Sequence, residues 1–210
     1  MTKQLFLTVS LLLSSGLSLN ATNIVLNGDF ETTNIGVNLF QPLAAGSLLL
    51  TNWTITAPVS TQGIDIISTR TGNLALANTG FQAIDMAGTP GRASIFQDLT
   101  TVIGQLYRIT FAGSSNGGPI TGGVTVLWGA SSVSTINTPA IGTWNSYSFD
   151  VVASAVTTRL TFQGNIDGTN GSFLDSVQVN DVVVPEPNLG FLAGSALMAV
   201  GLLRFRKSSN

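Results

Sequence analysis

Short runs in which side chains alternate in character, separated by turn residues, constrain the fold of this chain most strongly. In residues 105–114, Tyr107, Ile109 and Phe111 occupy every second position. This two-residue period is typical of a strand that packs one face on a core. Turn pairs such as Asn-Gly and Gly-Gly stand between the runs. The runs expected to form strands are 23–28, 48–56, 63–69, 81–87, 94–102, 105–114, 122–129, 145–154, 158–165 and 172–184.

This pattern predicts an all-β antiparallel sandwich or barrel, because many short strands joined by tight turns bury their apolar faces best in two layers. No stretch of residues 22–183 has a convincing helical period. The chain contains no cysteine, so the domain must be stable through its core alone. The 162 residues of this segment are enough to build one.

The first 21 residues differ in character from this segment. Residues 1–21 carry one cation, Lys3, followed by the apolar run Leu5–Leu13 and by small and polar residues down to Ala21. This order is typical of a secretory signal peptide. We expect cleavage after Ala21, with Ser18 as the alternative.

The C-terminal segment 184–210 combines an apolar run with a basic end. Leu189–Leu203 is 15 residues long and carries no charge; as a helix it would span about 22 Å. The basic residues that follow it are Arg204, Arg206 and Lys207. Because apolar residues would surround the whole helix, we expect a transmembrane helix stopped by these cations rather than a buried core helix. The positive-inside tendency then places residues 22–183 outside the cell.

The order of features in this tail is similar to a known sorting signal. Val184, Pro185, Glu186 and Pro187, followed by the apolar run and the basic end, resemble the PEP-CTERM signal of bacterial proteins processed by exosortase. The resemblance implies export, transient membrane anchoring and cleavage by exosortase near the two prolines. It also implies a bacterium that makes an exopolysaccharide matrix, with the protein at the cell surface or in that matrix.

A second resemblance covers most of the segment between these ends. The stretches NIVLNGDFE (23–31), FQAIDMAGTPGRASIFQDLTTVIGQLYRITF (81–111) and SFLDSVQV (172–179) are similar in order to the bacterial choice-of-anchor C domain. That domain is related to a plant cell-wall protein domain family and to the galactose-binding-like jelly roll. The resemblance implies a jelly-roll β-sandwich over residues 22–183. The sequence departs from the pattern at 34–50 and 116–140.

Composition excludes several classes of function. Residues 22–183 contain nine Asp or Glu and four Arg but no Lys, so their net charge is 4 − 9 = −5. Without a basic stripe to follow phosphates, we expect no nucleic-acid partner. The absence of His and Cys excludes Ser-His-Asp and Cys-His catalysis and zinc sites built on those ligands. Carboxylate chemistry, or no catalysis, remains.

The second resemblance implies a structural calcium site. Glycan-binding jelly rolls of this type often hold Ca²⁺ between the N-terminal segment and an acid near the last strand, here Glu31 and Asp175, with Asp29 as a further ligand. Ca²⁺ prefers six to eight oxygen ligands, which carboxylates and carbonyls supply. The alternative is that the carboxylates accept hydrogen bonds from turn amides and bind no metal.

Two further sets of residues are candidates for contact with a glycan. Trp128 lies in a variable region and is the best of the available rings for an exposed platform that stacks on a sugar, although it shares one strand face with Val124 and Val126, which favours a core position. Trp53, Trp144, Tyr107 and Tyr147 are expected to pack in the core. Asp65 and Asp85 could lie on neighbouring strands, but a glycosidase needs two carboxyl groups facing each other across a cleft.

The sequence therefore predicts an exported, non-catalytic β-sandwich protein that binds or associates with exopolysaccharide or another surface glycan. A purely structural or adhesive coat protein is the alternative. A carboxylate-based glycan hydrolase is a weaker one.

Overall fold

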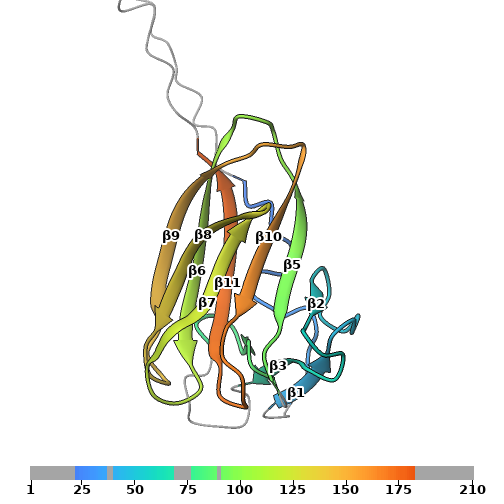
Figure 1. The fold of residues 1–210 in the computed structure, drawn as a ribbon, viewed down its shortest axis with the longest axis vertical. Coiled ribbons are helices and arrows are strands. Elements are labelled where there is room, and N and C mark those ends of the chain that lie inside the picture. Colours follow the sequence, from blue (N-terminus) through green and yellow to red (C-terminus); the bar gives the residue numbers. More distant parts are fainter. Residues whose placement is uncertain (1–21, 37–39, 69–76, 89–90, 183–210) are drawn as a thin grey trace, which may run out of the picture.

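The structure is a computed structural model that describes residues 22–36, 40–68, 77–88 and 91–182. They form a sandwich of two antiparallel sheets (Figure 1). The six-stranded sheet has the spatial order β1 (Phe40–Ala44), β3 (Gly63–Ser68), β4 (Gln82–Asp85), β11 (Ser172–Asp181), β6 (Leu106–Ser115) and β9 (Asn145–Val152). The five-stranded sheet has the order β2 (Thr54–Thr56), β5 (Ser94–Thr100), β10 (Thr157–Gly164), β7 (Ile120–Trp128) and β8 (Ser131–Thr138). The predicted all-β antiparallel sandwich is confirmed.

The core lies between the two sheets and follows the alternation of the sequence. In β6, Tyr107, Ile109 and Phe111 are buried. Phe162 of β10 lies at the centre of an aromatic cluster, with ring centroids 5.0 Å from Phe111 and 6.2 Å from Trp53. Each fully buried side chain of this size contributes roughly 1.5–3 kcal/mol to folding. These contacts join the two sheets without a disulfide.

The outward face of the six-stranded sheet is covered along β3, β4 and β11. The outward residues of these strands are all buried: Asp65, Ile67, Ala83, Asp85, Phe173 and Asp175. Ile67, Ala83 and Phe173 form an apolar cluster separate from the main core, and Ala77 and Trp144 pack onto it. We call this surface the covered face. The outward face of the five-stranded sheet, which we call the open face, keeps exposed or half-exposed side chains along β5 and β10.

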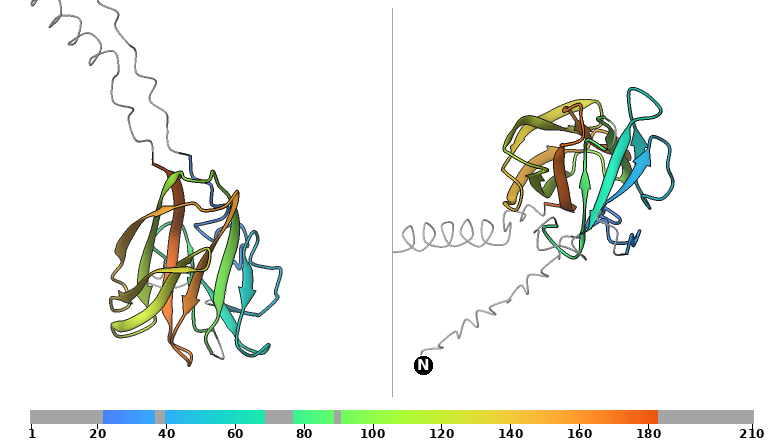
Figure 2. Two further views of the ribbon diagram at one scale, coloured as in Figure 1. Left: turned by 45° about the horizontal axis from the view of Figure 1, so that its top comes forward. Right: turned by 90° about the horizontal axis from the view of Figure 1, so that it is seen from below.

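The connections between the strands gather at two opposite ends of the sandwich (Figures 1 and 2). The β5–β6 and β9–β10 connections lie at one end, where the described chain also begins and stops; the amide of Thr22 there donates to the carboxylate of Asp181. The β6–β7 and β8–β9 connections lie at the other end, where the amide of Ile141 donates to the carbonyl of Gly117.

The predicted signal peptide (1–21) and sorting signal (184–210) lie outside the described residues, as do their motif residues. In the part of the chain that the structure describes, no helix is long and apolar enough to cross a membrane.

Two strand predictions were wrong in detail, and two strands were not predicted. Residues 23–28 form only one bridge, from Asn23 to Asn180, because the side chain of Gln97 takes the place of a ladder partner there. In 48–56 only Thr54–Thr56 form a strand. Strands β1 and β8 were not predicted, because both are edge strands with few large apolar residues, and β1 contains Pro42.

Candidate functional site

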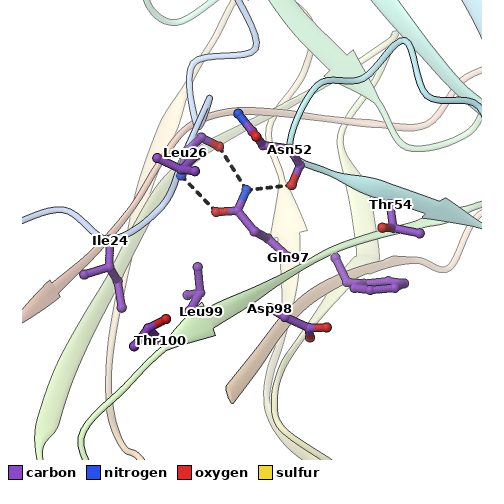
Figure 3. A pocket seen from close by; sticks show the side chains of 9 residues that line it. Ile24, Leu26, Asn52, Thr54, Gln97, Asp98, Leu99 and Thr100 are labelled. Atoms are coloured by element: carbon purple, nitrogen blue, oxygen red, sulfur yellow. Dashed lines mark hydrogen bonds between the residues drawn. The ribbon is translucent and has the colours of Figure 1, made fainter. Parts of the chain in front are cut away.

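A groove of about 560 Å³ runs along β5 beside the N-terminal segment. It forms because β2 pairs with β5 only over residues 94–96, so the edge of β5 from residue 97 onward has no ladder partner from β2. The lining residues are Ile24, Leu26, Asn52, Thr54, Phe96, Gln97, Asp98, Leu99 and Thr100. Figure 3 shows the N-terminal residues on one side, Asn52 and Thr54 on the other, and β5 between them.

The side-chain amide of Gln97 holds the two walls of the groove in place (Figure 3). Its oxygen accepts a hydrogen bond from the amide of Leu26 at 2.9 Å, and its nitrogen donates to the carbonyls of Leu26 at 3.0 Å and Asn52 at 2.9 Å. A buried amide with its acceptor and both donors engaged is costly to displace. The groove is therefore preformed.

An arginine stacked on an aromatic ring lies beside the groove on the open face. The guanidinium carbon of Arg159 lies 3.6 Å from the centroid of the Phe96 ring. The same guanidinium donates two hydrogen bonds to the Asp98 carboxylate, at 2.7 and 2.8 Å. These bonds hold the pKa of Asp98 below its ordinary value and raise the pKa of Arg159. Both side chains remain about half exposed, at 47% for Arg159 and 46% for Asp98.

The six-stranded sheet carries a matched pair without this setting. Arg108 of β6 donates two hydrogen bonds to Asp150 of β9, at 2.6 and 2.7 Å, and both side chains are similarly exposed. Among the described residues no aromatic ring lies over Arg108, and the groove does not reach it. This pair is a natural control for the pair on the open face.

The groove offers the groups that a sugar needs. The side chains of Asn52, Thr54, Asp98 and Thr100 can donate to or accept from hydroxyl groups, and Leu26 gives an apolar surface for C–H groups. Asp98 is the one carboxylate that lines the described groove, and Arg159 already binds it. The arrangement therefore suits recognition better than the two-carboxylate chemistry of glycoside hydrolysis.

The structure brings the predicted calcium ligands Glu31 and Asp175 to the same short segment. One oxygen of Glu31 accepts hydrogen bonds from the amides of Phe81 at 2.6 Å and Gln82 at 2.7 Å. One oxygen of Asp175 accepts from the amides of residues 78 and 79, at 2.8 and 2.9 Å. Burial, followed by weaker repulsion from Glu31, raises the pKa of Asp175 to about 7.

As these side chains stand, they do not fit a calcium site. One oxygen of Glu31 and both oxygens of Asp175 face N–H donors, and among the described residues Asp29 accepts only the amide of Glu31, at 3.4 Å. Within the described ranges no group of three or more acidic side chains could hold a metal ion. The contacts match the alternative in which Glu31 and Asp175 bind turn amides. Calcium stays a prediction that metal removal can test.

Trp128 is a core residue, so the possible carbohydrate contact there is corrected, and the core position that the alternation favoured is the one observed. Its side chain is 7% exposed, its ring centroid lies 5.9 Å from that of Tyr107, and its indole N–H donates to the carbonyl of Val152 at 3.0 Å. Alternation places it inward with Val124 and Val126 of the same strand. Trp53 is buried as predicted.

Asp65 and Asp85 are direct cross-strand neighbours on β3 and β4. Both lie in the covered face, at 5% and 1% exposure, so no open cleft separates them. The Asp85 carboxylate accepts hydrogen bonds from the amide of Ala87 at 3.0 Å and from the side chain of Asn116 at 2.9 Å. Burial above all raises the pKa of Asp85 to about 7. The burial of this pair gives no support to a hydrolase.

Reasoning from the sequence did not select Phe96 or Arg159 as functional residues. Phe96 lies in a predicted strand between two residues that face the core. Alternation therefore points its ring outward, but this signal is weak. Arg159 meets it only through the pairing of β10 with β5, which no local pattern reveals.

Comparison with known proteins gives a family and a fold. A family model described as "Protein of unknown function (DUF642)" matches residues 23–180. No curated protein matches the sequence. The structure of TmCBM61 in complex with beta-1,4-galactotriose is similar, with a TM-score of 0.52 and 13% identity over 77% of this chain and 99% of that one. At this identity the likeness is one of fold.

Two further solved structures are similar with lower scores. One is a family 35 carbohydrate binding module from Clostridium thermocellum, with a TM-score of 0.45 and 13% identity over 66% of this chain and 97% of that one. The other is the CBM22-1 xylan-binding domain from Paenibacillus barcinonensis, with a TM-score of 0.45 and 14% identity over 70% of this chain and 94% of that one.

Proposed function

Since this chain belongs to the DUF642 family and shares its sandwich fold with a carbohydrate-binding module, we propose that it is a non-catalytic carbohydrate-binding protein. The groove beside β5 is the proposed binding site. Its preformed walls, hydroxyl and amide groups and apolar surface support this function.

The observation that carries the proposal is the contact of Arg159 with Phe96 and Asp98 at the groove. A guanidinium fixed on one side by a ring and on the other by a carboxylate can donate to ligand hydroxyls without losing rotamer freedom on binding. Because Asp98 balances the charge of Arg159, and residues 22–183 carry a net charge of −5, the site favours neutral glycans over acidic ones.

The location of this activity is proposed from the sequence at the two ends. Residues 1–21 would direct export, and residues 184–210 would anchor the chain until exosortase removes the tail. Exopolysaccharide or another glycan at the cell surface or in the extracellular matrix is then the proposed partner.

The test is binding of the purified segment 22–183 to an array of neutral and acidic glycans. Arg159→Ala and the matched Arg108→Ala are measured beside it. We expect Arg159→Ala to weaken binding of a neutral glycan by about tenfold or more, the equivalent of about 1.4 kcal/mol. Arg108→Ala should bind like the unaltered segment, because its pair lies on the other sheet.

Other outcomes separate the alternatives. No binding to any glycan, with a folded segment that self-associates, would favour a structural or adhesive coat protein. Equal loss in both variants would place the binding site elsewhere on the domain. Release of reducing ends from a bound glycan would show hydrolysis and overturn the non-catalytic function.

A further inference from the structure

One end of the sandwich exposes four aliphatic side chains. Val102 and Ile103 lie in the β5–β6 connection, Val152 ends β9, and Val156 lies in the β9–β10 connection; they are 66%, 63%, 56% and 66% exposed. Figures 1 and 2 show that both connections lie at the end where the described chain begins and stops. We call these four residues the apolar end. A cluster of exposed aliphatic residues is typical of a contact surface.

Hydrogen bonds between the two connections hold the apolar end rigid. The amide of Thr101 donates to the carbonyl of Val156 at 2.9 Å, and its hydroxyl donates to the carbonyl of Ala155 at 2.7 Å. The amide of Gly104 donates to the carbonyl of Ala153 at 2.8 Å. The backbone on both sides of the four side chains is thus fixed, and they cannot fold back into the core without breaking these bonds.

The chain leaves the domain at this same end. The amide of Val182 donates to the carbonyl of Leu106 at 2.9 Å, and its carbonyl accepts from the side chain of Gln105 at 3.0 Å. Leu106 follows the connection that carries Val102 and Ile103. The uncharged run Leu189–Leu203 begins seven residues after Val182, and seven extended residues reach at most about 25 Å. Any bilayer that holds this run therefore lies close to the apolar end.

We propose that the apolar end rests on the surface of the lipid bilayer in which residues 189–203 are embedded. Burial of four aliphatic side chains in the interfacial layer would add to the hold of a run that is short for a bilayer. The nearest ion pairs along these strands, Arg108–Asp150 and Arg159–Asp98, are each neutral. Anionic headgroups thus gain no net attraction, and zwitterionic lipid is the expected partner.

This inference rests on the membrane anchorage proposed above and not on the carbohydrate groove. The groove lies along the side of the sandwich, on β5. Loss of bilayer contact would leave glycan binding intact, and loss of glycan binding would leave the contact intact.

The absence of cysteine from the chain allows a clean labelling experiment. The full chain is reconstituted in phosphatidylcholine nanodiscs that contain lipid with a nitroxide on its headgroup. A fluorophore is attached in turn to Val102→Cys, Val156→Cys and Ile141→Cys. Ile141 is the control because it is exposed and lies at the opposite end, one length of β6 away, or about 30 Å.

We expect the nitroxide lipid to quench the labels at positions 102 and 156 several-fold more than the label at 141. A triple variant, Val102→Ser, Ile103→Ser and Val156→Ser, labelled through Val152→Cys, should show quenching reduced to the level of 141. Its thermal melt serves as the check on folding.

Three results would overturn the proposal. The first is equal quenching at 102, 156 and 141. The second is failure of the full chain to remain with the nanodiscs on flotation, which would remove the anchorage itself. The third is energy transfer between labels at 102 on two copies without quenching by lipid, which would make the apolar end an interface between copies.

Discussion

The outward faces of the two sheets differ in whether their carboxylates are exposed or buried. On the open face, Asp98 is about half exposed and bound to Arg159, so its charge costs little. On the covered face, Asp85 and Asp175 are buried, and amide donors satisfy their oxygens. The open face therefore has groups free to meet a ligand. The covered face uses its carboxylates to hold turns and strands together.

The largest expected effect that follows from this difference is a dependence of stability on pH. Burial raises the pKa of Asp85 from 3.8 to about 7. Between these values the folded protein binds more protons than the unfolded chain, so the free energy of unfolding falls as pH rises from about 4 to about 7. A shift of about three units corresponds to about 4 kcal/mol at most.

Urea denaturation at several pH values from 4 to 8, in EDTA, measures this fall. Asp85→Asn should reduce it, since an amide does not titrate, and Asp175, whose pKa is raised likewise, contributes to the fall that remains. The contribution of Asp98 on the open face to stability changes with pH in the opposite direction. Because its pKa is lowered in the folded protein, the stabilisation is present at neutral pH and is lost only at low pH. A flat profile for the unaltered protein would contradict the burial of a titrating carboxyl.

The covered face itself contains two carboxylates that should respond differently to the same substitution. Within the described part of the chain Asp175 accepts only backbone amides, from Asn78, Thr79 and Ser176. In Asp175→Asn the new NH₂ group must face a fixed N–H donor, so we expect a loss of about 1–3 kcal/mol. One partner of Asp85 is the side chain of Asn116, which can turn its oxygen toward the new NH₂.

Asp85→Asn should therefore cost less than Asp175→Asn at neutral pH, as measured by the midpoint of urea denaturation. Equal losses would mean that both carboxylates act by charge rather than by the identity of their donors.

The alternation of the sequence was enough to predict the strands at the centre of the molecule. Tyr107, Ile109 and Phe111 are inward as expected, because a strand with one buried face must place every second residue on the core. The same rule applied to Trp128 favours the core, which the structure bears out. The idea that Trp128 forms an exposed platform came from its position in a variable region of the sequence. Such a position says little about which way a side chain points from a strand.

The site was harder to predict because it depends on contacts between distant strands. Arg159 and Asp98 are 61 positions apart, and they meet through the register of β10 on β5. Gln97 reads as an inward polar residue, and its role depends on where residues 26 and 52 run. The covered face was also unpredicted, because its cover comes from loops rather than from a strand with a period of its own.

The two Arg–Asp pairs allow a smaller test of the same comparison. Exposed ion pairs contribute about 0–1 kcal/mol each. The contact with the Phe96 ring should add about 0.5–1 kcal/mol to the pair on the open face. Arg159→Ala should thus destabilise the domain slightly more than Arg108→Ala. A double-mutant cycle with Phe96→Leu measures the difference, and a coupling of zero would show that the stacking contributes no stability.

The smallest expected effect is that of calcium. The oxygens of Glu31 and Asp175 already accept five backbone amides between them at 2.5–2.9 Å. A bound cation would have to displace these N–H groups or lie against them. We therefore expect the melting temperature of the segment 22–183 to be the same in calcium and in EDTA. Glu31→Gln should lower it in both buffers alike, since the side chain then holds the turn less well. A melting temperature that rises in calcium, and no longer does so in Glu31→Gln, would instead show that the turn rearranges to bind the metal, and that the covered face is stabilised by a cation rather than by amides.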